Sequence, residues 1–235
     1  MDDVEGSAQT YSVARFNGKK TQESSAVIAS WPRPAQPLEL YEFQACPFCK
    51  RVREGATYFD LDTVIYPCPR DGPTWRPKAI ALGGKAQFPL LRDPNTGTVM
   101  YESNDILKYM AEKYGDGAVP SGLSSGVAPI LCGLALLPRA GNGGKYRRSK
   151  VTEATKPLIF WAYEASPFCI LVREVLTELE IPHIVRTAAR GSPKRQELLA
   201  EQGLFQVPFL VDPNTGRSMF ESSYIMEYLE STYAA

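Results

Sequence analysis

From residue 38 onward, apolar and polar side chains follow short patterns that predict regular secondary structure. Residues 38–43, LELYEF, alternate between the two kinds, which is typical of a strand with one buried face. Between residues 47 and 59 the apolar positions recur at helical spacing, and a proline occupies the first helical position, where its missing N–H is not needed. Residues 63–67, TVIYP, predict the next strand.

The pattern continues with a short helix, a hairpin and a longer helix. Residues 74–82 predict the short helix, and two glycines follow it as a C-cap. Residues 88–102 indicate two strands joined by an Asp-Pro-Asn-Thr-Gly turn. The last helix begins at Ser103, which we expect to cap it, and ends at Gly115. The element order is therefore β-α-β-α-β-β-α.

This series of motifs occurs twice. Three motifs return in the same order about 120 residues later, which indicates a duplicated module of roughly 80 residues. We expect the second copy to repeat the helices near residues 167–179, 193–201 and 222–233. The paired segments are ACPFCKRVRE (45–54) with ASPFCILVRE (165–174), QFPLL (87–91) with QVPFL (206–210), and RDPNTGTVMYES (92–103) with VDPNTGRSMFES (211–222).

The repeat divides the chain into four parts. We expect the first module at residues 37–115 and the second at residues 156–235, each an α/β unit with a mixed four-stranded sheet. Residues 1–36 are polar and are interpreted as a flexible N-terminal arm. Residues 116–155 form the linker, whose ends are rich in Gly, Ser and basic residues.

The middle of the linker is apolar. Residues 127–137, VAPILCGLALL, form the longest apolar run of the chain, and this run is too short to span a bilayer. We interpret it as a short helix that packs on one module or bridges the two. A peripheral contact with a membrane surface is the alternative that the sequence leaves open.

Composition and charge exclude several classes of function. Lys plus Arg and Asp plus Glu both number 26, so there is no electrostatic reason to expect a nucleic acid partner. Five cysteines in a long chain do not suggest a secreted disulfide framework, and no secretory signal follows Met1. A single C-x-x-C and a single histidine, His183, argue against a zinc site, and His183 is interpreted as a half-buried strand residue.

The C-P-F-C motif carries the most specific chemistry. Cys46 lies just before the first helix, where unpaired N–H groups and the positive end of the helix dipole stabilise a thiolate and lower its pKa. Lys50 and Arg53 are expected to add positive charge nearby. Cys49, one turn into the helix, lies within reach of a mixed disulfide formed on Cys46, as thiol–disulfide exchange requires. The alternative is two inert, buried thiols.

Two further sites accompany the cysteines. Pro89 opens the hairpin, and a cis bond before it would turn a backbone N–H and C=O toward the thiol, where an extended peptide can pair with them. The alternative is an ordinary edge-strand proline. Glu102 and Ser103 precede a helix and can hold the ammonium and carboxylate of an amino acid; the alternative is a plain helix cap.

Together these motifs resemble the glutathione-binding thioredoxin-like fold. The chain is similar to glutaredoxins and to the N-terminal domain of glutathione S-transferases. Its tandem arrangement resembles plant plastid and cyanobacterial proteins with two such domains. LELYEFQACPFCKRVRE and FPLLRDPNTGTVMYES also resemble the thioredoxin-like part of prostaglandin E synthase type 2. The resemblance implies two tandem thioredoxin-like domains, glutathione as co-substrate, and a chloroplast or cyanobacterial cytoplasmic location.

The resemblance also implies roles for individual residues. Cys46 is the nucleophile of a redox-active centre, and Cys49 is the resolving or auxiliary thiol. The remaining implied contacts are with glutathione: Phe88 and Pro89 meet its cysteinyl backbone, Glu102 and Ser103 hold its γ-glutamyl end, and Lys85 approaches its glycine carboxylate.

The second copy lacks the attacking thiol. Ser166 replaces Cys46, and a serine hydroxyl is too weakly acidic to act as a thiolate at neutral pH. Cys169 lies inside the helix and is expected to be buried. We therefore expect the second module to be structural or substrate-binding rather than a second active site. Its vestigial site comprises Ser166, Cys169, Val207, Pro208, Glu221 and Ser222.

Three functions remain open at this point. The first is a glutathione-linked thiol–disulfide oxidoreductase that acts through Cys46. The second is a non-catalytic binding or scaffold subunit of a larger assembly, possible partners including a photosynthetic membrane complex. The third is glutathione transfer or isomerisation; it is disfavoured because transferases of this type carry a large helical domain where this chain carries a linker and a second module.

Overall fold

The first module forms in the predicted order. The structure is a computed structural model, and it describes residues 11–16, 19–23, 30–124, 126–139 and 141–235. The first module begins with an extended strand, and its second helix ends at Gly84, which adopts φ 84° as the predicted glycine C-cap. Its elements are β3 (Leu38–Glu42), α1 (Pro47–Tyr58), β4 (Thr63–Pro67), α2 (Trp75–Gly83), β5 (Leu90–Asp93), β6 (Thr98–Met100) and α3 (Ser103–Tyr114).

The second module repeats this order, so the predicted α/β fold class is confirmed. The three helices lie within one or two residues of the predicted bounds, because both copies carry the same caps and turns. His183 begins a strand as expected, but it is fully buried rather than half-buried. The elements are β7 (Leu158–Ala162), α6 (Pro167–Glu178), β8 (His183–Thr187), α7 (Lys194–Gln202), β9 (Phe209–Asp212), β10 (Arg217–Phe220) and α8 (Ser222–Tyr233).

The arm and the linker also contain regular structure. In the arm, β1 (Tyr11–Phe16) and β2 (Lys19–Glu23) pair as an antiparallel ribbon that the sequence patterns did not predict. Residues 1–10, 17–18 and 24–29 of the predicted flexible arm lie outside the described residues. The linker forms α4 (Ser121–Ser124), α5 (Ala128–Leu136) and the 3-10 turn η2 (Leu137–Arg139), and α5 packs against α1 of the first module.

The end of the arm docks on the first module. The guanidinium of Arg33 donates to the carbonyl oxygens of Phe59 and Tyr114, both at 2.9 Å. The Trp31 ring lies 5.8 Å from the Phe59 ring. These contacts attach residues 30–36 to the ends of α1 and α3, so this stretch is not free of the module.

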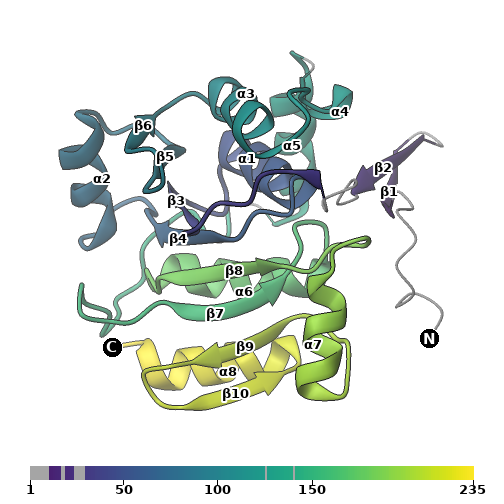
Figure 1. Cartoon of the computed structure of the whole chain (residues 1–235). Coiled ribbons are helices and arrows are strands. Elements are labelled where there is room, and N and C mark those ends of the chain that lie inside the picture. The colour runs from purple at the N-terminus through teal and green to yellow at the C-terminus, as the bar shows by residue number, and fades with distance from the viewer. Residues whose placement is uncertain (1–10, 17–18, 24–29, 125, 140) are drawn as a thin grey trace.

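Both modules share one sheet. Eight strands run in the order β10-β9-β7-β8-β4-β3-β5-β6, and each half is mixed because one neighbouring pair is parallel and the others antiparallel. The halves meet where β4 pairs antiparallel with β8, for instance Val64 with Ile184. Figure 1 shows the strands of the second module continuing the sheet of the first. The expected four-stranded sheets are therefore present as two halves of one eight-stranded sheet.

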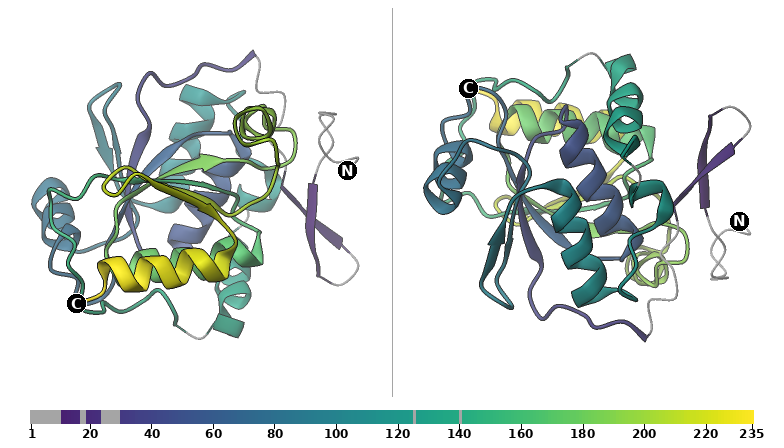
Figure 2. Two further views of the ribbon diagram at one scale, coloured as in Figure 1. Left: turned by 90° about the horizontal axis from the view of Figure 1, so that it is seen from below. Right: turned by 90° about the horizontal axis from the view of Figure 1, so that it is seen from above.

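Alternate residues of the central strands face two different layers. Leu40 belongs to the main core beneath α1 and α3, whereas its neighbour Tyr41 belongs to a smaller core beneath α2, because successive strand residues point to opposite faces. Phe160 and Trp161 divide in the same way in the second module. The main core contains residues of both modules, and the views along the sheet in Figure 2 show helices on either side of it.

In each module, a carboxylate also contacts the start of a helix in the other module. Asp60 and Glu180 stand at matching positions after α1 and α6, and both have φ 53°. The Glu180 carboxylate accepts the N–H of Thr74 at 3.0 Å, at the start of α2. Asp60 accepts from the Lys194 ammonium at 3.1 Å, at the start of α7. The Glu180 carboxylate is favourably placed beside the positive end of α2, and Asp60 forms an ion pair with Lys194, so each module stabilises the other.

Candidate functional site

Cys46 is the N-cap residue of α1. Its backbone is extended, with φ −87° and ψ 120°, and Pro47 fills the first helical position. The Cys46 sulfur accepts the backbone N–H of Cys49 at 3.2 Å. Hydrogen bonds from the Cys49 thiol and from its backbone N–H lower the pKa of the Cys46 thiol, although burial acts in the opposite direction. The helix start therefore favours the ionised sulfur, as the sequence argument requires.

Cys49 has the opposite properties. It is 1% exposed, and burial raises the pKa of its thiol well above the ordinary value, with the neighbouring Cys46 acting in the same direction. Within the pair, Cys46 is therefore the thiol that ionises first. This division matches a nucleophile followed by a protonated second thiol.

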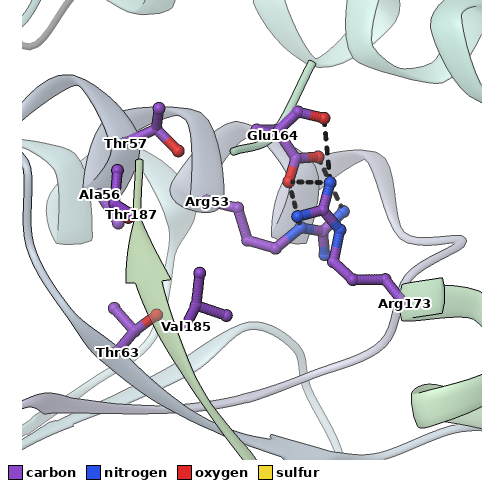
Figure 3. A pocket seen from close by; sticks show the side chains of 8 residues that line it. All are labelled: Arg53, Ala56, Thr57, Thr63, Glu164, Arg173, Val185 and Thr187. Atoms are coloured by element: carbon purple, nitrogen blue, oxygen red, sulfur yellow. Dashed lines mark hydrogen bonds and ion pairs between the residues drawn. The ribbon is translucent and has the colours of Figure 1, made fainter. Parts of the chain in front are cut away.

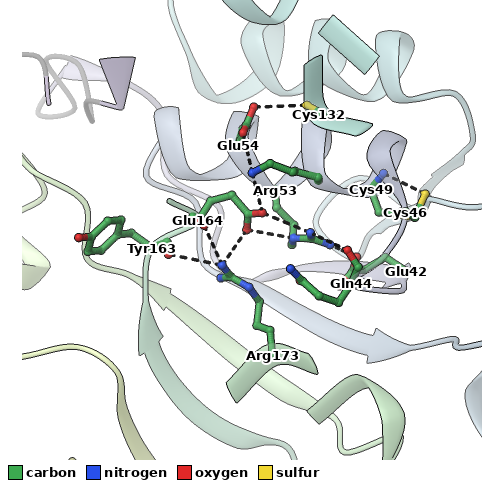
Figure 4. A network of polar contacts seen from close by, with 11 residues as sticks. Glu42, Gln44, Cys46, Cys49, Arg53, Glu54, Cys132, Tyr163, Glu164 and Arg173 are labelled. Atoms are coloured by element: carbon green, nitrogen blue, oxygen red, sulfur yellow. Dashed lines mark hydrogen bonds and ion pairs between the residues drawn. The ribbon is translucent and has the colours of Figure 1, made fainter. Parts of the chain in front are cut away.

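Lys50 and Arg53, which we expected to add positive charge near Cys46, are both paired with carboxylates. The Lys50 ammonium lies 2.8 Å from the Glu54 carboxylate and 3.3 Å from that of Glu164. Arg53 pairs with Glu42 and, at 3.0 Å, with Glu164. Figure 4 shows Arg53 pointing toward Glu42 and Glu164. The Arg53 charge nevertheless lowers the pKa of the Cys46 thiol, as expected. The pairing of both side chains with Glu164 was not predicted, because Glu164 comes from the second module, which local sequence does not place here.

Glu164 joins the two modules electrostatically. It accepts hydrogen bonds from Arg53, and its carboxylate lies 3.1 Å from the Arg173 guanidinium of α6. Burial alone would raise the pKa of Glu164, but the charges of Arg173, Arg53 and Lys50 together lower it to about 2. Ion pairs this deeply buried require every partner, because a lone charge there is strongly unfavourable.

A small cavity lies beside this cluster rather than at Cys46. Its volume is about 10 Å³, enough for roughly one water molecule and far too small for a tripeptide. Figure 3 shows the side chains of both modules around it. The cavity therefore belongs to the junction between the modules. It is lined by Arg53, Ala56, Thr57, Thr63, Glu164, Arg173, Val185 and Thr187.

The proline loop lies next to the cysteine loop. The Phe88–Pro89 bond is cis, as the sequence suggested, and Pro89 directly precedes β5. The Phe88 ring stands 6.1 Å from the ring of Phe43, in the loop that leads to Cys46. On its other side, the Arg76 guanidinium lies 4.6 Å from the centre of the Phe88 ring. The cysteines and the proline, distant in sequence, are thus brought to one end of the sheet.

Glu102 and Ser103 stand at the start of α3, but Ser103 does not cap the helix. Glu102 is the N-cap residue and adopts φ 66°, while Ser103 is the first helical residue. The Ser103 hydroxyl instead accepts from the Arg51 guanidinium at 3.3 Å. The predicted cap was wrong because the left-handed Glu102 backbone starts the helix without a side-chain cap. The Lys85 ammonium lies 4.7 Å from the Tyr101 ring, beside the same loop.

Sequence reasoning missed a glutamine at this site. The Gln87 amide donates to the Glu102 carboxylate, and in the second module Gln206 donates to Glu221 in the same way. The signal was present, because both copies of the repeat carry Gln before the proline motif and Glu before the last helix. The pair ties the proline loop to the start of the last helix and orients the carboxylate.

The second module preserves the backbone of the site without its thiol. Ser166 is the N-cap residue of α6, and its hydroxyl accepts the Cys169 N–H at 3.3 Å. Cys169 is fully buried, as predicted, and burial raises the pKa of its thiol. The Val207–Pro208 bond is cis, and Glu221 adopts φ 70° before Ser222, the first residue of α8. The copies therefore differ in sulfur chemistry rather than in framework.

The described part of the chain holds no cluster of three or more His, Cys, Asp or Glu side chains placed to bind a metal ion. Among the same residues, no helix is long and apolar enough to cross a membrane.

Comparison with known families agrees with this framework. The family described as "Glutathione S-transferase, N-terminal domain" matches residues 40–118 and, a second time, residues 160–235. The chain belongs to this family. Its two matches coincide with the two copies of the strand, cysteine-loop and proline-loop arrangement, so the family domain occurs in tandem. No curated protein matches the chain.

Among solved structures, the chain is similar to the Bombyx mori glutathione transferase BmGSTD1. For its complex with GTT the sequence identity is 26%, the TM-score is 0.33, and the match covers 36% of this chain and 39% of that one. The trimeric Leishmania glutathione transferase TDR1 is 14% identical, with a TM-score of 0.32, over 86% of this chain and 68% of that one. The chain thus matches well under half the length of the Bombyx mori enzyme.

Proposed function

We propose that this protein is a glutathione-linked thiol–disulfide oxidoreductase of the glutaredoxin type. The nucleophile is Cys46, in a catalytic module at residues 37–115. The observation that carries the proposal is the N-cap geometry of Cys46, where the Cys49 N–H lies 3.2 Å from the sulfur and the pKa of the thiol is lowered. A thiolate at a helix start is the reactive form in thiol–disulfide exchange.

The reaction proceeds by two exchanges. The Cys46 thiolate attacks the glutathione sulfur of a mixed disulfide; a new S–S bond forms to Cys46, the substrate S–S bond breaks, and the substrate leaves as a thiolate that takes up a proton. A second glutathione, deprotonated, then attacks this bond, which releases glutathione disulfide and restores the Cys46 thiolate. The sulfur of the second glutathione is oxidised and the substrate sulfur is reduced to a thiol, while the first glutathione sulfur is in a disulfide before and after the reaction. Cys49, buried and protonated, is the auxiliary thiol.

Glutathione is the co-substrate, and its contacts follow the end of the sheet at which these loops meet. The backbone at Phe88 and Pro89 pairs with the cysteinyl residue, since it lies beside the cysteine loop. Glu102 and Ser103 at the start of α3 hold the γ-glutamyl end. Lys85 approaches the glycine carboxylate. Family membership and the similarity to glutathione transferases support this assignment.

The second module, residues 156–235, is non-catalytic in this proposal. Ser166 occupies the position of the nucleophile and cannot form a thiolate, whereas Pro208 and Glu221 retain the framework of a glutathione cradle. Its role is to bind or to support, through the shared sheet, the module that carries Cys46.

The proposal is tested with Cys46→Ser. We expect this variant to lose glutathione-dependent reduction of a small mixed disulfide, because a serine hydroxyl is not ionised at neutral pH. Cys68→Ser is the matched control: it removes a thiol that is fully buried beneath α2 and retains an oxygen able to donate to the Tyr66 carbonyl. Equal activity in wild type and Cys46→Ser would refute the mechanism. Conjugation of a standard electrophile without disulfide reduction would favour transfer instead.

A second candidate, a binding or scaffold subunit, is favoured by one specific observation. The outer face of the linker helix is aliphatic and exposed, and it comprises Val127, Ile130, Leu131, Leu134 and Leu137. Exposed patches of this kind are typical of interaction sites. The protein partner, the peripheral membrane contact and the chloroplast or cyanobacterial location belong to this candidate. It predicts that Cys46→Ser leaves the biological role intact, whereas Leu134→Glu abolishes association with the larger assembly.

A further inference from the structure

The linker lies across the mouth of the cysteine loop. We use the term "cover" for α5, η2 and residues 141–144. On the cover, the Cys132 sulfur lies 3.7 Å from the Glu54 carboxylate of α1, and Gly133 lies against Pro47, the residue after Cys46. The Gly143 carbonyl accepts the N–H of Ala45, the residue before Cys46, at 3.4 Å. The nucleophile is thus bracketed on both sides by contacts with the cover.

Two glycines allow this close approach. A β-carbon at position 143 would come within 2.6 Å of the Gln44 Cβ, and one at position 144 within 3.2 Å of the Ala45 Cβ. Gly143 also adopts φ 71°, a conformation that other residues rarely take. Cys46 is only 5% exposed in this arrangement. A residue so buried offers little surface for the in-line contact that attack on a substrate disulfide requires.

Besides packing on α1 of the first module, the cover is hydrogen-bonded to the second module. The Arg139 guanidinium donates twice to the Glu174 carboxylate of α6, at 2.6 and 2.8 Å. The Gly143 N–H donates to the Glu178 carboxylate at 2.8 Å. Both acceptors lie on α6, in the module that lacks the nucleophilic thiol. The second module is therefore placed to determine whether the nucleophile of the first is accessible.

One group beneath the cover is unfavourably placed. Gln44, two residues before Cys46, is 1% exposed, and neither end of its side-chain amide has a hydrogen-bond partner within the described part of the chain. Removing an amide from water without a replacement partner is unfavourable. Burial of the unpaired Gln44 amide therefore destabilises the closed arrangement. The contacts of Arg139 and Gly143 with α6 offset this destabilisation.

We infer that the cover is an autoinhibitory element that shields Cys46 and must move off the cysteine loop before a disulfide substrate can react. The inference rests on the proposed function for the identity of the nucleophile, and it adds how that nucleophile is regulated. The second module acts in it as the anchor of the closed state.

The test is site-resolved alkylation of the folded full-length chain by iodoacetamide, followed by mass spectrometry. Gly143→Ala introduces a β-carbon that collides with Gln44, whereas Gly141→Ala, at φ 86° in the same loop, meets nothing within 4 Å and is the matched control. We expect Gly143→Ala to raise the alkylation rates of Cys46 and Cys132 together by about tenfold relative to the control, the effect of little more than 1 kcal/mol. Cys169, in the core of the second module, should stay unlabelled. Labelling of Cys169 would indicate general unfolding.

A second pair of variants removes the anchor without touching the cysteine loop. Arg139→Ala breaks the two hydrogen bonds to Glu174, and Arg92→Ala breaks a similar two-fold contact with Glu39 in the sheet of the first module. The two arginine side chains are 40% and 43% exposed, so the perturbations are comparable. We expect faster alkylation of Cys46 and Cys132 in Arg139→Ala only.

Two results would overturn the inference. One is wild-type Cys46 that alkylates as fast in the folded chain as in the unfolded chain at the same pH. The other is unchanged labelling in both Gly143→Ala and Arg139→Ala. Failure of the proposed function would give a different result. Glutathione-dependent reduction would then be absent from every variant. In a Cys46→Ser background, Gly143→Ala would still raise the labelling rate of Cys132.

Discussion

Two effects of opposite sign act on the Cys46 sulfur. Hydrogen bonds from Cys49 favour the thiolate, and burial disfavours it; the hydrogen bonds prevail, so the pKa is lowered. At Cys132 the balance is reversed, because burial dominates and raises the pKa to about 12. Position at the start of a helix, rather than exposure, therefore distinguishes the reactive thiol of the site from the inert one.

The pH dependence of alkylation follows from this difference. We expect the alkylation rate of Cys46 to reach half its plateau below about pH 8.5, the ordinary cysteine value. The rate of Cys132 should still rise steeply above that pH, since its pKa is raised. Rates are measured from pH 5 to 10 in Gly143→Ala, where both thiols are accessible. A Cys46 midpoint at or above the ordinary value would contradict the assignment of the thiolate.

Among the elements, helices α1 and α6 are joined through a single carboxylate. Glu164 follows β7 and pairs with Arg53 of α1 and Arg173 of α6. Removing one member of such a cluster leaves buried charges without compensation, which costs about 3–5 kcal/mol. The junction therefore depends on Glu164 more than on any exposed ion pair.

Glu164→Gln should lower the free energy of unfolding by about 3–5 kcal/mol at neutral pH. The folded-state pKa of Glu164 is depressed to about 2, so its contribution is present above the unfolded value of about 4.3 and is lost as pH falls from there toward 2. The difference between wild type and variant should therefore shrink across that range in urea titrations. Glu42→Gln is the control, because the pKa of Glu42 is raised by burial and the sign reverses. A pH-independent difference would contradict the role of Glu164.

Local sequence patterns predicted the fold of each module but not how the two modules pack together. The strands, helices, cis-proline loops and Cys46 N-cap followed from spacing, turn residues and the repeat, because these depend on neighbours in sequence. The pairing of β4 with β8 did not, since an edge strand has the same alternation as an inner one. Glu164, the partner that Lys50 and Arg53 share, and Gly143, which contacts Ala45, lie more than ninety residues from these side chains in sequence, and nothing local specifies the contacts.

At the scale of the whole molecule, the two modules share one main core and one eight-stranded sheet. The main hydrophobic cluster contains side chains from both modules, and the eight strands are continuous. Reciprocal contacts of Asp60 and Glu180 with helices of the opposite module strengthen the same junction. Without the other half, β4 and β8 would each be an edge strand.

Unfolding should accordingly be a single cooperative transition. Trp161 lies in the second module, and Trp31 and Trp75 report on the first, so Trp161→Phe restricts tryptophan fluorescence to the first module. We expect the fluorescence and far-ultraviolet circular dichroism midpoints of this variant to coincide in urea, because the shared core melts as one unit. Midpoints that separate would show that the modules unfold independently.

The pairing of β4 with β8 within one chain also affects how the sequences of the two copies can differ. Subunits encoded by one gene must all change together, because every substitution appears in each of them. Here the halves are covalently tied in a fixed ratio of one to one, so a substitution alters only the copy in which it occurs. Ser166 can therefore stand opposite Cys46 without depriving the molecule of its sulfur nucleophile, and the sheet preserves an asymmetry that a pair of identical chains cannot have.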